Sequence, residues 1–157
     1  MKIKSKFLGE QQIDPETVLT FPKGIPGFET YQHYKLFHQQ DGNGLYWLQS
    51  VDDEDVTFSL AEPSHFNINY TFILDNEESE LLAADDPESL VIMLLLHTEG
   101  TSDTQQQLTI KGSIKAPIII NPFSKRGYQK MLQTIEQSIT LTERRNEIAL
   151  EETHSTQ

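Results

Sequence analysis

The sequence predicts a mostly β fold: a single antiparallel domain, either a sandwich or a barrel, with one or two short helices. Many short apolar stretches recur along the 157 residues, with Pro- and Gly-containing turns between them, which is typical of an antiparallel sandwich or barrel. A chain of this length can bury one core without disulfides or metal. We expect one domain over residues 1–150 and a flexible polar tail over 151–157.

The first half of the chain alternates strand patterns with turns. Apolar or alternating stretches that predict strands span residues 3–7, 18–21, 34–37, 45–48, 56–61 and 70–74. Gln39–Gly44 is predicted to be a hairpin loop, because its glycines permit positive φ. Asp52–Asp55 is expected to form an acidic turn between two strands.

The second half begins with a helix. Residues 77–84 have helix-forming composition, with Asp75 or Asn76 as the N-cap and Asp85-Asp-Pro87 as the stop. Strands are then expected over 90–96, 108–114 and 117–121. The first of these is apolar throughout, as in a strand that is buried on both faces.

The segment that follows allows two interpretations. Five apolar residues fit one stripe of a helix, while the β-rich context favours strand pairing for part of the segment. They are Tyr128, Met131, Leu132, Ile135 and Ile139.

Residue types and spacings argue against an enzyme. The chain has no cysteine, which excludes disulfides, thiolate metal sites and cysteine nucleophiles. Its five histidines are scattered and no H-E-x-x-H, P-loop or G-x-S-x-G motif occurs. We therefore expect no catalytic residue, no cofactor and no metal. A metal-dependent hydrolase that uses His33, His38 and nearby carboxylates is the less favoured alternative.

The formal net charge is −12. Such charge repels phosphates and argues against direct nucleic-acid binding, whereas it would attract a basic protein partner or merely keep the chain soluble. The N-terminus has no apolar signal core, and the longest apolar run is far shorter than the about 20 residues that span a membrane. We expect a cytoplasmic protein without a membrane partner.

The segment Phe21-Pro-Lys-Gly-Ile-Pro-Gly-Phe28 is unusual because it combines two Phe and one Ile with a stiff Pro/Gly loop. Two interpretations remain open: a turn whose aromatic rings fill the core, or an exposed apolar contact site. A rigid loop suits binding, since little conformational freedom is lost on docking.

Several segments in a fixed order carry a resemblance to a known family. They are Phe21–Glu29, Trp47–Val51, Asp55–Phe58, Pro63, Tyr70, Asp86–Leu90, Lys115–Asn121 and Arg126–Gln129. Over about residues 1–135 the chain resembles the FliW family of bacterial flagellar assembly factors. One departure is Lys111-Gly-Ser-Ile114, where family members often read Thr-Ala-Asn-Leu.

The resemblance implies a β-barrel-like fold, no enzymatic activity and two protein partners. These are flagellin, the filament subunit, and CsrA, a small basic dimeric RNA-binding regulator of translation. In that scheme free flagellin occupies the protein; once flagellin is secreted, the released protein binds CsrA and relieves repression of flagellin synthesis. A flagellin chaperone without a CsrA partner is the alternative.

Six residues are expected to contact a partner. Ile25 and Phe28 would act as apolar anchors, and an amide with three carboxylates would supply the polar and acidic complement to a basic protein. The polar members are Gln49, Asp52, Asp53 and Asp55.

Overall fold

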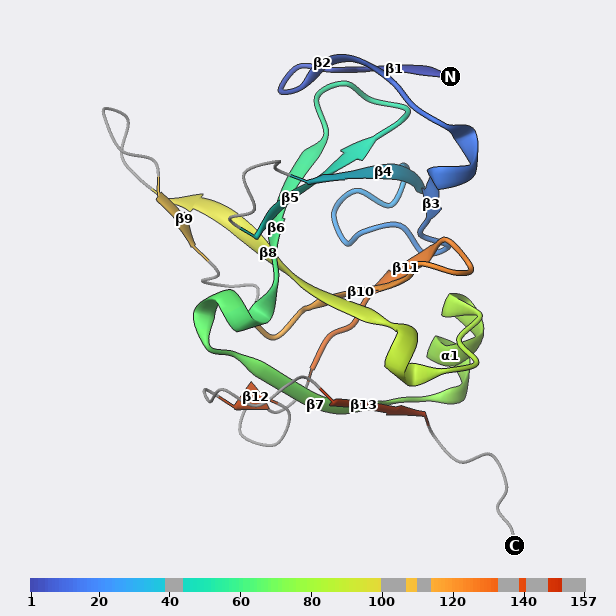
Figure 1. Cartoon of the computed structure of the whole chain (residues 1–157), viewed down its shortest axis with the longest axis vertical. Helices are drawn as coiled ribbons and strands as arrows, with labels where there is room; N and C mark the ends of the chain where they lie inside the picture. The colour runs from blue at the N-terminus through green and yellow to red at the C-terminus, as the bar shows by residue number, and fades with distance from the viewer. Residues whose placement is uncertain (39–43, 100–106, 110–113, 133–138, 141–146, 151–157) are drawn as a thin grey trace, which may run out of the picture.

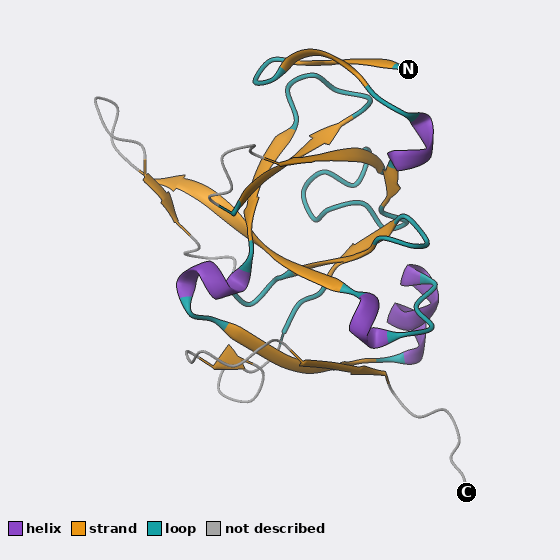
Figure 2. Ribbon diagram, viewed as in Figure 1, coloured by secondary structure: helices purple, strands orange, loops and turns teal. Residues whose placement is uncertain are grey.

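The structure is a computed structural model that describes residues 1–38, 44–99, 107–109, 114–132, 139–140 and 147–150. Within these ranges, seven strands close into a barrel (Figures 1 and 2). In order around the ring they are β10 (Ile118–Asn121), β11 (Arg126–Gln129), β3 (Leu19–Thr20), β4 (His33–His38), β5 (Leu45–Ser50), β6 (Thr57–Ala61) and β8 (Val91–Glu99). Pairing of β10 with β8 closes the ring, and the predicted barrel-like β fold is confirmed.

The barrel departs from the prediction in one respect. Its strands pair antiparallel except β3 and β11, which run parallel with Thr20 opposite Arg126. A short strand near the N-terminus thus pairs with one from the last third of the chain, which local patterns cannot reveal. Strand β9 (Gln107–Thr109) pairs antiparallel with the C-terminal end of β8, outside the ring. The rest of the expected strand over 108–114 lies largely outside the described residues.

Smaller elements flank the barrel. The hairpin β1 (Lys2–Ser5) and β2 (Gly9–Gln12) lies at one end in Figure 1. At the other end, β7 (Asn69–Leu74) pairs with β12 (Ile139–Thr140) and with β13 (Glu147–Leu150). In the described ranges, 3-10 turns span Pro15–Thr17, Pro63–Phe66 and Pro87–Ser89. None of the described helices is long and apolar enough to cross a membrane.

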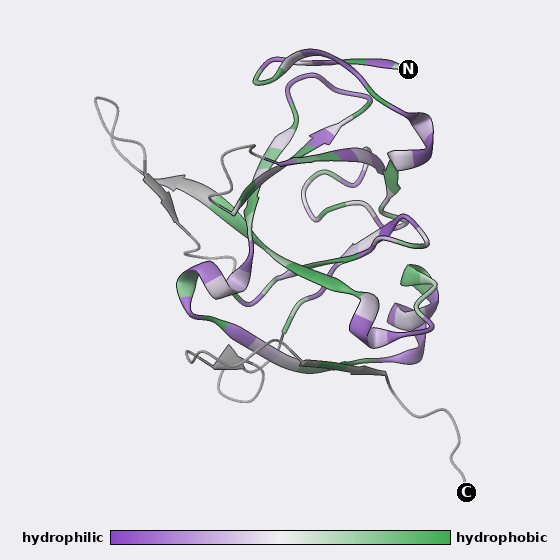
Figure 3. Cartoon of the chain, in the orientation of Figure 1, coloured by the Kyte–Doolittle hydropathy of each residue, from purple (hydrophilic) through white to green (hydrophobic). Residues whose placement is uncertain are grey.

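Two apolar clusters share strand β8. Met93 packs inside the barrel with Phe21, Tyr34 and neighbouring residues, while Ile92 and Leu94 face the second cluster, beneath β7 and α1. Because side chains alternate along a strand, β8 has to be apolar on both faces, as the sequence predicts. Figure 3 shows this hydrophobic band along β8 and β10.

Helix α1 (Asn76–Leu82) begins at Asp75, one of the two predicted N-caps. Asp75 Oδ1 accepts from the Glu78 N–H at 2.8 Å and Glu78 Oε1 accepts from the Asp75 N–H at 2.9 Å, so the two form a capping box. The helix ends at Ala83 in the left-handed region, with φ 49°, before the expected stop.

The ambiguous segment is strand at two of its five apolar residues, whereas Met131 and Leu132 follow β11 outside any strand. Arg126–Gln129 pairs with β10, which places Tyr128 in a strand, and Ile139 lies in β12. Ile135 and the expected tail over 151–157 lie outside the described residues.

Candidate functional site

The Pro/Gly loop after β3 folds back on itself. Gly24 has φ +67°, and a Cβ there would lie 2.7 Å from Glu29 Cα, so only glycine fits this position. The Ile25 side chain is 1% exposed and packs in the barrel cluster with Phe21. The expected direct contact of Ile25 with a partner is therefore corrected to a packing role, because the tight turn directs the side chain inward.

Phe28 is the large apolar side chain of this loop that faces solvent. Its side chain is 40% exposed, and its ring stands edge-on to Phe58 with centroids 5.0 Å apart. Both interpretations of the loop therefore hold for different residues: Phe21 and Ile25 fill the core, and Phe28 is available for contact.

The acidic turn, residues 52–55, is held by the buried end of β5. Ser50 Oγ accepts from the N–H groups of Asp52 at 3.0 Å and Asp53 at 3.1 Å. Gln49 is fully buried; its Nε2 donates to the carbonyls of Ser50 at 3.0 Å and Asp53 at 3.1 Å, and its Oε1 accepts from Thr57. Gln49 braces the turn rather than reaching a partner, which corrects its expected role.

Tyr31 joins the Pro/Gly loop to the acidic turn. Its hydroxyl donates to Asp53 Oδ2 at 2.6 Å. This hydrogen bond is the main cause that raises the pKa of Tyr31 and lowers the pKa of Asp53, and the Asp55 N–H lowers the pKa of Asp53 further. Sequence reasoning missed Tyr31, since no local pattern links it to a turn 22 residues away.

Lys6 contacts the acidic turn from the N-terminal hairpin. Its N–H donates to the Glu54 carbonyl at 2.9 Å, and its Nζ lies 2.8 Å from Asp55 Oδ1, which raises the pKa of Lys6. The turn carries four carboxylates, at residues 52 to 55, and the Lys6 ammonium pairs with Asp55, which leaves a net of three negative charges. Asp52 and Glu54 are exposed beside them.

The histidines of the hydrolase alternative do not come together. His33 and His38 occupy the two ends of β4, about 16 Å apart along an extended strand. Among the described residues, no group of three or more His, Asp or Glu side chains could hold a metal ion.

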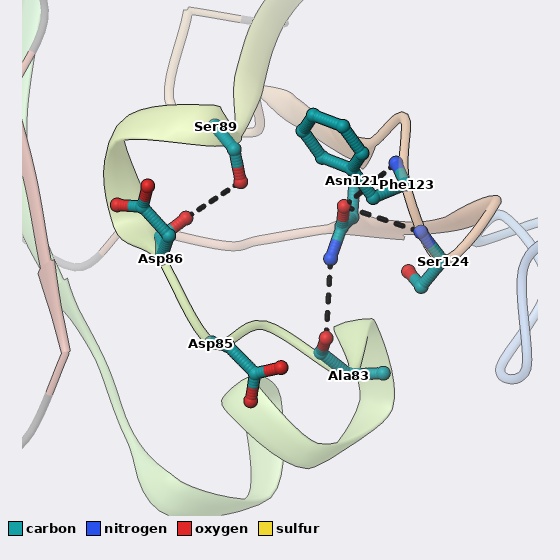
Figure 4. Close-up of a pocket in the computed structure, with 7 residues that line it drawn as sticks. All are labelled: Ala83, Asp85, Asp86, Ser89, Asn121, Phe123 and Ser124. Carbon is teal, nitrogen blue, oxygen red and sulfur yellow. Dashed lines mark hydrogen bonds between the residues drawn. The ribbon is translucent and has the colours of Figure 1, made fainter.

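A pocket of about 390 Å³ lies between the end of α1 and the β10–β11 turn (Figure 4). The C-terminal end of α1, the turn before β8 and the β10–β11 turn line it. Its polar and aromatic side chains are Asp85, Asp86, Ser89, Asn121, Phe123 and Ser124. Sequence reasoning did not single out Phe123, although a Phe between Pro and Ser in a tight strand connection is a signal for an exposed ring.

Comparisons with known proteins agree on one family. A family model described as "FliW protein" matches residues 2–143. A flagellar assembly factor FliW 1 from Desulfotalea psychrophila is 42% identical over 119 residues, which cover 75% of this chain and 82% of that protein. A flagellar assembly factor FliW from Azoarcus sp. is 33% identical over 145 residues, 92% of this chain and 99% of that protein.

A solved structure agrees with the sequence relatives. The crystal structure of a flagellar assembly factor FliW superposes with a TM-score of 0.70 at 28% identity, and the match covers 85% of this chain and 90% of that one.

Proposed function

The chain belongs to the FliW family of flagellar assembly factors, and on this premise we propose that it is a cytoplasmic, protein-binding regulator that binds flagellin and CsrA in turn. The family is one of assembly factors and not of enzymes. In the proposed scheme free flagellin occupies the protein, and secretion of flagellin releases it. The released protein then binds CsrA and relieves the repression of flagellin synthesis.

The convergence of the acidic turn with Phe28 is the observation that carries the CsrA half of this proposal. The acidic turn keeps a net of three negative charges, and Phe28 is 40% exposed. Tyr31 joins the two segments, because its N–H donates to the Phe28 carbonyl and its hydroxyl donates to Asp53. Negative charge steers a basic protein toward the surface. An aromatic ring supplies the apolar contact around which hot spots form.

The scaffold under this surface is built for docking without rearrangement. Gln49, Ser50 and Lys6 hold the backbone of the acidic turn, and the Gly24 turn fixes the loop that bears Phe28. Binding then loses little conformational entropy. We expect Asp52, Asp53, Asp55 and Phe28 to contact the partner, with Ile25 and Gln49 supporting them from inside.

Calorimetry with purified CsrA and purified flagellin tests the proposal. The wild-type protein should form a stoichiometric complex with each. The CsrA complex should weaken as salt rises, because added ions screen the exposed charges. No complex with either protein at micromolar concentration would contradict the proposed function.

Two double variants with the same change in charge distinguish the effect of the acidic turn on CsrA binding from the effect of the total net charge. Asp52→Asn with Glu54→Gln should weaken CsrA binding about tenfold and flatten the salt dependence. Glu16→Gln with Glu80→Gln removes the same charge from exposed positions elsewhere and should leave affinity nearly unchanged. Equal losses in both would mean that only overall charge matters.

The flagellin-chaperone alternative shares one partner with the proposal. A protein that binds flagellin yet neither binds CsrA nor relieves translational repression by CsrA in a reporter assay would establish that alternative.

A further inference from the structure

Phe123 is the most exposed large apolar side chain in the described part of the chain, with 80% of its surface open to solvent. It lies in the β10–β11 turn at the edge of the 390 Å³ pocket (Figure 4). An exposed phenyl ring next to a hollow of this size is a feature of binding surfaces rather than of ordinary turns.

The ring is presented by an ordered turn. Asn121 is buried, and its Oδ1 accepts from the N–H groups of Phe123 at 3.0 Å and Ser124 at 3.3 Å. Its Nδ2 donates to the Leu82 carbonyl at 2.9 Å, and Ser124 Oγ donates to the same carbonyl at 2.7 Å. The end of α1 therefore fixes the turn, so covering the ring would order little that is not already ordered.

Charge selects what the pocket can accept. In Figure 4 the Asp85 carboxylate lies across the pocket from the Phe123 ring, and it is exposed. Asp86 stands at the rim, where Oδ1 accepts from the Glu88 N–H. Among the described residues no lysine, arginine or histidine lines the pocket. The adjacent Lys125 and Arg126 donate instead to the carbonyls of Pro122 and Leu81.

We propose that this pocket receives an arginine side chain from a basic segment of a protein partner. A guanidinium plane can stack on the Phe123 ring while its N–H groups donate to Asp85. A purely apolar occupant would desolvate the carboxylate without a partner, and an acidic one would be repelled. Lysine fits less well, because a compact ammonium lacks the planar face that stacks.

The inference deepens the proposed function and rests on it for the identity of the basic partner. The pocket would add a second contact region, separate from the acidic turn. Two regions that each bind weakly raise the overall affinity when one partner spans both.

A titration followed by NMR tests the pocket without any protein partner. N-acetyl-arginine amide, added to the full chain, should shift the backbone amides of Ser89, Phe123 and Ser124 with millimolar affinity. N-acetyl-citrulline amide, a neutral analogue of similar shape, should bind at least about threefold more weakly. An equal response to both compounds, or none to arginine, overturns the inference.

Variants assign the response to the two side chains. Phe123→Ala and Asp85→Asn should each weaken arginine binding about three- to tenfold. Phe7→Ala is the control, because Phe7 is also well exposed but lies in the β1–β2 turn; it should leave the titration unchanged. Unchanged binding in both pocket variants would refute the assignment.

Binding to CsrA then separates this inference from the proposed function. Weaker CsrA binding by both pocket variants supports both. If the wild type binds arginine but not CsrA, the proposed function fails, whereas the inference that the pocket binds arginine is kept, with a different basic protein as the partner. If the wild type binds CsrA and both variants bind it equally, without an arginine response, only the pocket inference fails.

Discussion

The Lys130 ammonium lies 2.7 Å from Oε1 and 2.9 Å from Oε2 of Glu78, with the two side chains only 15% and 9% exposed. Glu78 also completes the capping box of α1, and Lys130 Nζ lies 5.9 Å from the centroid of the Phe72 ring. This pair ties α1, and with it one wall of the Phe123 pocket, to the segment after β11.

Removing Glu78 should therefore destabilise the fold. Glu78→Ala leaves a mostly buried ammonium unpaired and takes away half of the capping box, so we expect the free energy of unfolding to fall by about 3–5 kcal/mol, measured by urea titration. Glu77→Ala is the matched control: the Lys23–Glu77 pair is as short, 2.7 Å, but well exposed, and its loss should be hard to detect. Similar effects of both changes would contradict the structural role of Glu78.

Tyr31→Phe should release Asp53. Without the hydroxyl, the pKa of Asp53 should rise toward its ordinary value, since the Tyr31 hydrogen bond is the main cause of its lowering. A carboxyl group whose pKa is lower in the folded state stabilises the fold at pH values above its unfolded-state pKa of about 3.9. This stability is lost as the pH falls through the folded-state pKa. The variant should thus lose less stability than the wild type on acidification below about pH 4.

NMR titration of the Asp53 carboxyl carbon checks this prediction. Tyr46→Phe serves as the control. Tyr46 lies at the other end of β5 and its hydroxyl donates to Glu62, so this variant should leave the pKa of Asp53 unaffected. An unchanged pKa of Asp53 in Tyr31→Phe would show that the hydrogen bond does not form in solution.

Gly127→Ala should overpack the barrel. A Cβ at Gly127 would lie 2.3 Å from Cζ of the buried Phe21 ring, so we expect a loss of about 3 kcal/mol in the free energy of unfolding. A double variant with Phe21→Leu should lose less than the sum of the two single changes, because the smaller side chain leaves room for the methyl group. Additive losses would argue against direct contact.

Two buried tyrosines should respond oppositely to loss of the hydroxyl. Within the described residues, the Tyr34 hydroxyl is buried without a hydrogen-bond partner, whereas the Tyr70 hydroxyl donates to the Ile114 carbonyl at 2.6 Å. Tyr34→Phe should be neutral or stabilising, and Tyr70→Phe should reduce stability by about 1 kcal/mol. A clear loss of stability in Tyr34→Phe would show that the Tyr34 hydroxyl has a hydrogen-bond partner in solution.

Tyr34 also makes the stability of the fold depend on pH in the alkaline range. Burial raises the pKa of Tyr34 to about 12, so its neutral form contributes stability that is fully present below about pH 10 and is lost as pH rises further. The Tyr34→Phe variant should lose less stability than the wild type between about pH 10 and 12.

Local features of the fold were predictable from the sequence. The β4–β5 hairpin follows from alternating stretches around a Gly-containing loop, and the start of α1 follows from an Asp three residues before a Glu. The segment around Tyr128 is ambiguous in the sequence because its apolar residues fit a helical stripe while the β-rich context favours a strand. Pairing with β10 decides between them, and that contact is not a local property.

The candidate site was predictable only in part. The acidic turn and Phe28 stood out by charge and by an unusual loop composition, and both are exposed. Ile25 and Gln49 were assigned as contacts, yet both are buried, because residue type does not reveal which way a side chain points in an irregular segment. Tyr31, Lys6 and Phe123 gain their roles from neighbours far away in sequence.

By itself, the sequence determined the fold class, the acidic character and the positions of most strands, because alternation, turn residues and charge are properties of neighbouring residues. Only the tertiary structure decided that β3 pairs with β11 to complete the ring, that Tyr31 holds Asp53, and that Phe123 stands open over a pocket. Each of these depends on contacts between segments that are distant along the chain. Burial and hydrogen bonding there are set by how the whole chain packs, and no local period encodes them.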